Sequence, residues 1–110
     1  MSITVNLYYM GENGNARKFA EEMEQSGVAD RIRNEDGNLR YEYFVPLKQP
    51  ETVLLIDSWK DQESLDKHHA SSMMNEIAKL REKYDLHMSV ERYISDSEGV
   101  PDKDRAFIRK

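Results

Sequence analysis

Apolar and polar residues alternate over residues 3–9 and 86–94, and alternation of this kind predicts β-strands. Residues 39–45 and 53–59 are rich in branched and aromatic side chains, which predicts two further strands. Turn-forming residues follow or precede each stretch. The chain is therefore expected to contain four short strands.

Helical spacing appears in the two long intervals between strands. In the first interval the expected buried face consists of Ala16, Phe19, Ala20 and Met23, and Gly27 is expected to end the helix. Residues 28–38 are predicted to be a polar connection that closes with the turn dipeptide Asp36-Gly37. This connection leads into the second strand.

The second helical interval begins at Asp61, a suitable N-cap, and continues to about Tyr84. Its apolar stripe consists of Leu65, Met73, Ile77, Leu80 and Tyr84. Ser71-Ser72 can cap a separate helical piece, and a break there would change which side chains share a face. The order of elements predicts an α+β fold of the ferredoxin-like β-α-β-β-α-β type with an antiparallel sheet.

The strand at residues 53–59 is apolar on both faces, which is typical of a strand covered on both sides. The predicted helices cover one face of the sheet only. A second copy of the same sheet is the simplest cover for the other face, so the sequence predicts a homodimer.

Composition and charge exclude several classes of protein. A length of 110 residues suits one domain, and a net charge of −5 without a basic stripe argues against a nucleic-acid partner. No apolar run is long enough for a membrane span, and no membrane partner is expected. The absence of cysteine excludes thiolate chemistry and favours the cytoplasm.

Two regions of the chain are expected to behave differently. Residues 1–96 are expected to form the domain, and residues 97–110 a polar tail that ends with the apolar residues Ala106, Phe107 and Ile108. An apolar tip on a polar tether is often docked on a surface. We therefore expect the tail to pack on the partner subunit.

The strand exit at Trp59, followed by His68 and His69, is the strongest candidate site. Two histidines adjacent on a helix point about 100° apart, so they are a poor pair for one metal ion, and no metal site is expected. Each candidate also has an ordinary structural interpretation. Trp59 suits a core position, either histidine suits a helix surface, and Asn6 suits a sheet or dimer interface.

Several of these segments resemble the antibiotic biosynthesis monooxygenase family, which includes quinol monooxygenases. The likeness spans residues 3–94 and rests on Leu39-Arg40-Tyr41, the strand ending Asp57-Ser58-Trp59, the motif Leu65-x-x-His68 and the strand ending Val90-Glu91-Arg92-Tyr93. The resemblance implies a dimeric α+β barrel. It also implies oxidation of a small aromatic, of quinol or phenol type, by molecular oxygen without metal, flavin or other cofactor.

Such chemistry needs a base, an apolar cavity and a wall for the ring. With this family in view, the predicted catalytic residues are His68 as proton acceptor, Trp59 as stacking wall, and Asn6 as hydrogen-bond donor if it faces the helices. The predicted substrate-binding residues are Tyr41, Leu55, Asp57, His69 and Met73. The resemblance favours His68 over His69 for the proton transfer.

Two other functions remain as alternatives, and a third, haem degradation, is disfavoured. Haem-degrading relatives of this fold resemble the chain only at Asn6, and Ala78 stands where their iron-ligating histidine would be expected, which disfavours haem. Isomerases of small phosphorylated signal molecules would need a phosphate site, for which Arg40, Arg81 and Arg92 are the candidates. A small-molecule-binding or stress-response dimer without turnover fits the same fold.

Overall fold

The computed structural model describes residues 1–110 and places four strands in one antiparallel sheet of order β2-β3-β1-β4. The strands are β1 Ile3–Met10, β2 Asn38–Phe44, β3 Thr52–Trp59 and β4 His87–Ile94. The helices are α1 Asn15–Gln25, α2 Val28–Arg33, α3 Gln62–His69, α4 Met73–Lys83 and α5 Asp102–Arg105. The predicted ferredoxin-like fold is confirmed.

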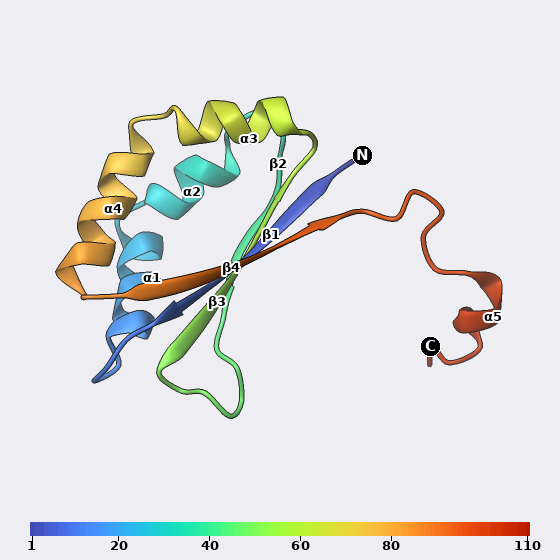
Figure 1. The fold of residues 1–110 in the computed structure, drawn as a ribbon, viewed down its shortest axis with the longest axis horizontal. Helices are drawn as coiled ribbons and strands as arrows, with labels where there is room; N and C mark the ends of the chain where they lie inside the picture. The colour runs from blue at the N-terminus through green and yellow to red at the C-terminus, as the bar shows by residue number, and fades with distance from the viewer.

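Helices α1 to α4 all lie on the same side of the sheet (Figure 1). The strand register shows which residues share the face that the helices cover. Val5 on β1 lies opposite Asp57 on β3 and Arg92 on β4, so these three side chains are on that face. The buried core, including Phe19 and Leu55, lies between this face and the helices. The expected covering of one face by helices is therefore confirmed.

The other face of the sheet is not covered within the single chain (Figure 1). It presents Tyr8, Phe44, Leu54 and Ile56, which are all partly exposed. Asn6 also lies on this face, opposite Ile56. We call it the open face.

A short helix occupies the segment expected to be a polar connection. Helix α2 follows Gly27, whose φ of +87° ends α1 and allows the chain to turn, and it buries Val28, Ala29 and Ile32. These three apolar residues recur at helical spacing, but six residues are too few to stand out among polar neighbours. Tertiary packing, rather than local propensity, stabilises α2.

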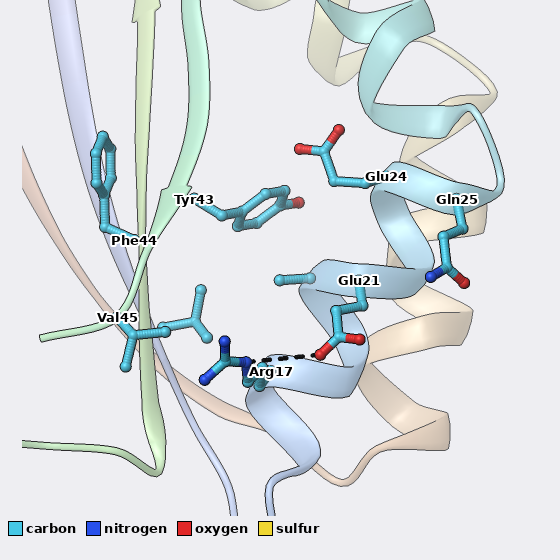
Figure 2. Close-up of a pocket in the computed structure, with 9 residues that line it drawn as sticks. Arg17, Glu21, Glu24, Gln25, Tyr43, Phe44 and Val45 are labelled. Carbon is cyan, nitrogen blue, oxygen red and sulfur yellow. Dashed lines mark ion pairs between the residues drawn. The ribbon is translucent and has the colours of Figure 1, made fainter.

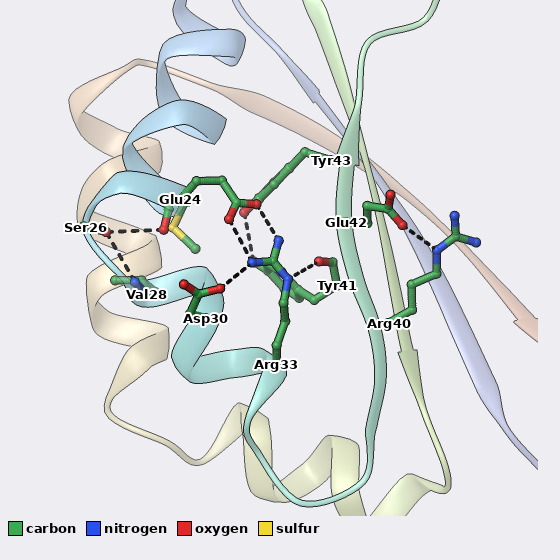
Figure 3. Close-up of polar contacts among 10 residues, drawn as sticks. Glu24, Ser26, Val28, Asp30, Arg33, Arg40, Tyr41, Glu42 and Tyr43 are labelled. Carbon is green, nitrogen blue, oxygen red and sulfur yellow. Dashed lines mark hydrogen bonds and ion pairs between the residues drawn. The ribbon is translucent and has the colours of Figure 1, made fainter.

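Arg33 at the end of α2 connects three elements, as Figure 3 shows. Its guanidinium donates to Glu24 on α1, to Asp30 on its own helix and to the carbonyl oxygen of Tyr41 on β2. The hydrogen bonds to Glu24 and Asp30 raise the pKa of Arg33 further above its usual value. This network fixes α2 against the sheet edge.

The chain continues past β4 into a tail that leaves the body of the molecule (Figure 1). Helix α5 and the apolar tip are exposed, with Phe107 at 88% and Ile108 at 50% exposure. None of the helices is long and apolar enough to cross a membrane.

Candidate functional site

A cavity of about 290 Å³ lies between the sheet and helices α3 and α4. Its walls are mainly apolar, and every strand of the sheet contributes to them. The lining residues are Val5, Leu7, Tyr9, Tyr41, Leu55, Asp57, His68, His69, Met74, Ile77, Arg81, Met88 and Val90. We call this space the site cavity. An apolar cavity with a few convergent polar groups is typical of a small-molecule site.

The start and the end of α3 bring His68 to the site cavity. Asp61 accepts a hydrogen bond from the backbone N–H of Ser64 (2.9 Å), as expected of the cap. The helix ends at His69, where the Ser71 hydroxyl donates to the His68 carbonyl (2.7 Å), and α4 begins after this break. Only 3% of His68 remains exposed. The histidine therefore belongs to the interior, while His69 lies at the exposed rim.

Glu35, in the turn between α2 and β2, orients the His68 ring. Its Oε1 lies 3.0 Å from His68 Nδ1. Gly37 allows this turn to approach α3, since its φ is +85° and a Cβ there would lie 2.1 Å from Ser64 Oγ. A carboxylate at Nδ1 favours the tautomer protonated at that nitrogen. His68 Nε2, which has no hydrogen-bond partner within the chain, is then left as a proton acceptor.

Trp59 lies behind His68 and does not line the site cavity. Its ring stacks on the imidazole with centroids 4.8 Å apart and planes at 27°, and the indole is completely buried. Its Nε1 donates to Asp57 Oδ1 at 2.8 Å. Trp59 therefore contacts two polar side chains of the site from behind, and it does not face the cavity as a wall would.

Asp57 is a buried carboxyl group beside His68. Burial raises its pKa to about 6; nearby His68 and the hydrogen bond from Trp59 oppose this rise, and Glu35 adds to it. Its Oδ2 has no hydrogen-bond partner within the chain. The site cavity thus combines an oriented imidazole with a carboxyl group that changes charge near neutral pH, and such perturbed pairs are typical of functional sites.

Two tyrosines supply neutral phenol groups to the same walls. Burial raises the pKa of Tyr9 to about 12, with Arg81 acting against the rise and Asp57 adding to it. Burial also raises the pKa of Tyr41 well above its usual value, and its hydroxyl lies 3.0 Å from that of Tyr43. Both lining tyrosines therefore stay protonated at neutral pH and can only act as neutral hydrogen-bonding groups.

Residues 2–80 match the family model for antibiotic biosynthesis monooxygenase. The chain belongs to the antibiotic biosynthesis monooxygenase family. The predicted resemblance is confirmed by this match, which contains His68, Asp57 and Glu35. No significant match was found among curated proteins.

Solved structures support the family fold. A conserved protein from Methanosarcina mazei Go1 superposes with a TM-score of 0.74 at 24% identity, covering 87% of this chain and 94% of that one. A structure described as an antibiotic biosynthesis monooxygenase gives a TM-score of 0.70 at 19% identity, with coverage of 86% and 98%. SnoaB, described as a cofactor-independent oxygenase from Streptomyces nogalater, gives 0.71 at 9% identity, with coverage of 87% and 94%.

The structure separates the predicted site residues of this family member into two groups. Those that line the site cavity are Tyr41, Leu55, Asp57, His68 and His69. Those that do not are Asn6, Trp59 and Met73. Met73 packs against the core at the start of α4, and its neighbour Met74 takes the lining position.

Asn6 was predicted to donate a hydrogen bond to the substrate if it faced the helices, and it does not face them. It alternates with Val5 and Leu7, which face the helices, so its side chain lies on the open face instead. There its Oδ1 is buried without a hydrogen-bond partner. The amide cannot reach a substrate held in the site cavity.

The structure also brings to the site Glu35, which was not predicted for any site, and Arg81, which was a candidate for a phosphate site only. Glu35 is 33 positions from His68 and has no local pattern that connects the two. Arg81 follows Ile77 by four residues, so the helical stripe itself was a signal that it shares the inner face of α4. No group of three or more His, Asp or Glu side chains is arranged to hold a metal ion.

A second hollow, of about 330 Å³, lies between α1 and strands β2 and β3 (Figure 2). We call it the α1 groove. Its lining residues are Arg17, Ala20, Glu21, Glu24, Gln25, Tyr43, Phe44, Val45 and Val53. Arg17 and Glu21, which both come from α1, form an ion pair at 3.6 Å along the helix side of this groove (Figure 2). None of the predicted site residues lines the α1 groove.

Proposed function

We propose that this protein is a cofactor-independent monooxygenase that adds one oxygen atom of O₂ to a small phenol or quinol. The observation that carries the proposal is His68, a buried imidazole bonded through Nδ1 to Glu35, with Nε2 free in an apolar cavity. Membership of the family and the fold shared with SnoaB support this reaction class. A chain without cysteine suits a cytoplasmic enzyme, and we include that location in the proposal.

The proposed reaction begins with proton transfer from the substrate hydroxyl to His68 Nε2. The phenolate gives one electron to O₂, and the resulting aryloxyl radical and superoxide combine to form a carbon–oxygen bond. His68 returns its proton to the resulting peroxide, and the ring carbon that carries the peroxide then loses its hydrogen as a proton while the oxygen–oxygen bond breaks. The departing oxygen leaves as water with these two protons, and a carbonyl group remains. A phenol and O₂ thus yield a quinone and water, and four electrons pass from the ring to oxygen.

The surroundings of His68 suit each step of this sequence. Glu35 and an ionised Asp57 both stabilise the imidazolium that forms when the substrate loses its proton. The apolar walls exclude water, which would otherwise solvate the phenolate and superoxide. The substrate ring would rest against Leu55, Ile77 and Tyr41 rather than against Trp59.

The test is oxygen consumption by metal-free protein with a panel of hydroquinones and bicyclic phenols. We expect uptake by the wild type, a loss of at least a hundredfold in His68→Ala, and no loss in the control His87→Ala, which changes an exposed histidine outside the site cavity. With ¹⁸O₂, one labelled atom should enter the product. This label separates a monooxygenase from simple autoxidation, which returns oxygen as hydrogen peroxide.

Each of the other outcomes would contradict the proposal. Uptake that is equal in His68→Ala and wild type would remove His68 from the chemistry. Tight binding of the same aromatics without any uptake across the panel would instead favour a binding protein without turnover. A folded His68→Ala variant, verified by circular dichroism, is required for the first of these conclusions.

We also propose that the active form is a homodimer closed through the open face, as a dimeric α+β barrel. The partly exposed Tyr8, Phe44, Leu54 and Ile56 support this arrangement, because a second sheet would remove their apolar surface from water. The exposed tail, residues 97–110, would pack on the partner subunit through Phe107 and Ile108. Light scattering should give twice the chain mass.

Deletion of the residues after Ser97 tests the role of the tail. We expect weaker dimerisation and a lower melting temperature in the truncated protein, because an apolar tip is lost from the interface. Unchanged dimer affinity together with an unchanged melting temperature would contradict this role. The site cavity lies within one chain, so ligand binding by the folded truncated chain serves as the control.

A further inference from the structure

The site cavity contains one permanently positive side chain that has no negatively charged partner. Arg81 Nη1 donates to Met88 Sδ at 3.0 Å, and Arg81 forms no other hydrogen bond and no ion pair within the chain. A thioether is a weak acceptor, while a guanidinium carries five N–H donors. Most of the hydrogen-bonding capacity of Arg81 is therefore unused where it lines the cavity.

The other two arginines that were candidates for an anion site do not share this position. Arg40 lies on the open face and pairs with Glu42 at 3.0 Å. Arg92 donates to Gln62 on α3 at 2.7 Å and does not line the site cavity. Arg81 is thus the arginine that the fold places against the space where a ligand would lie.

Arg81 and His68 lie toward opposite ends of the site cavity. Met74, Ile77 and Arg81 follow one face of α4 at successive turns, which places Arg81 about 10 Å along the helix axis from Met74. Met74 is near the break that joins α4 to α3 and its His68. Tyr9 also lines the cavity; burial raises its pKa to about 12, with Arg81 acting against the rise and Asp57 adding to it.

We propose that Arg81 binds a carboxylate of the substrate, and that the substrate class is a bicyclic hydroxyaromatic acid with its phenol at His68. This inference rests on the proposed function for the identity of the reacting end. The apolar residues between the two ends suit a fused ring system. A cavity of about 290 Å³ is near the low end for small-molecule sites, which favours two rings over larger polycyclic systems.

The charge balance favours a carboxylate over a phosphate. One planar guanidinium matches the two oxygens of a carboxylate in a bidentate pair. A phosphate monoester carries close to two negative charges at neutral pH, but Arg81 is the only lining residue that is always positive, and Asp57 adds a negative charge when ionised. A dianion would therefore be poorly neutralised.

The test is isothermal titration of the full chain with four probes at pH 7.5. The probes are 6-hydroxy-2-naphthoate, 2-naphthol, 2-naphthoate and 2-naphthyl phosphate. We expect hydroxynaphthoate to bind about ten- to a hundredfold more tightly than naphthol, as a charge-assisted pair predicts. Arg81→Met should abolish this difference, Arg81→Lys should keep part of it, and the control Arg92→Met should keep it whole.

Three results would overturn the inference. The first is equal affinity for naphthol and hydroxynaphthoate in the wild type, and the second is a preference that survives in Arg81→Met. The third is tighter binding of naphthyl phosphate than of naphthoate, which would point to a phosphate site. Thermal unfolding of Arg81→Met verifies that the variant is folded, and the binding of neutral naphthol shows that its cavity is intact.

This binding test is independent of turnover. A carboxylate preference that depends on Arg81, without oxygen uptake, would support the inference about the ligand and contradict the monooxygenase. Oxygen uptake with neutral naphthols and no carboxylate preference would support the monooxygenase and contradict the role of Arg81. The two failures are therefore distinguishable.

Discussion

The site cavity and the α1 groove differ little in volume, about 290 and 330 Å³, yet they differ sharply in their charges. In the α1 groove the acidic side chains are well hydrated, and Arg17 and Glu21 neutralise each other with 69% and 58% of their side chains exposed. In the site cavity Asp57 and His68 are at most 6% exposed, and Arg81 has no anionic partner. Buried, incompletely neutralised charge, rather than size, makes the site cavity the candidate functional site.

The architecture explains this difference. The α1 groove opens at the edge strand β2, where long side chains on α1 reach water (Figure 2). The site cavity lies over the central strands β1 and β3 and beneath two helix segments separated by the break at Ser71. Side chains that point inward there lose their hydration, so their charges must be stabilised by each other or by a ligand.

Removal of the indole behind His68 should give the largest effect on stability. Trp59→Ala leaves a large void beneath a stacked imidazole, and we expect it to lower the free energy of unfolding by about 3–5 kcal/mol. The matched change in the α1 groove, Val45→Ala, removes a 41% exposed side chain and should cost less than about 1 kcal/mol. Urea unfolding measures both, and similar losses would contradict the contrast between the two hollows.

The second-largest effect should be a pH dependence of stability that arises from Asp57 in the site cavity and not from the α1 groove. The pKa of Asp57 is raised from 3.8 to about 6, so the folded protein binds this proton more tightly than the unfolded chain does. Stability from this group is fully present below about pH 4 and is lost as pH rises through about 6. Asp57→Asn removes the charge and keeps an acceptor for Trp59, so it should stabilise the protein by about 1–3 kcal/mol at pH 7.5.

The advantage of Asp57→Asn should disappear near pH 4, where the wild-type carboxyl group is also neutral in the folded state. Melting temperatures of both proteins from pH 4 to pH 8 provide the measurement. A constant difference across this range, or a variant that is less stable at pH 7.5, would show that the Asp57 charge is well accommodated in the fold.

Loss of the contact at His68 Nδ1 should affect activity more than stability. Glu35→Ala removes the acceptor that fixes the tautomer, and we expect oxygen uptake to fall by about tenfold or more. Glu35→Gln keeps an acceptor oxygen and should restore most of the activity. Nitrogen NMR of the imidazole should show protonated Nδ1 in the wild type and a tautomer mixture in Glu35→Ala; an unchanged spectrum would contradict the positioning role.

Local patterns predicted the four strands and α1, because alternation and helical spacing are visible within a few residues. For the second helical interval they left one continuous helix and a break at Ser71-Ser72 as alternatives, and the structure has the break. The spacing left His68 and His69 open, and the family resemblance favoured His68 and singled out the strand that ends Asp57-Ser58-Trp59. Alternation could have placed Asn6 on the open face, since it is out of phase with Val5 and Leu7.

The rest of the site depends on contacts between distant segments. Glu35 reaches His68 only because α2, a helix too short to be visible in the pattern, and Gly37 bring their turn against α3. Trp59 was predicted to stack on the substrate ring. Its position at the end of a strand does not show on which side of His68 the indole lies. Both features required the packed structure.

The smallest effect should come from the ion pair of the α1 groove. Glu21→Gln breaks an exposed i,i+4 pair with Arg17, whose contribution to the free energy of unfolding is expected to be below about 0.5 kcal/mol and to vanish at high salt. Naphthoate affinity should also be unchanged, since Glu21 does not line the site cavity. A measurable loss of ligand affinity in Glu21→Gln would show that the α1 groove takes part in binding, and charge burial would then no longer separate the two hollows.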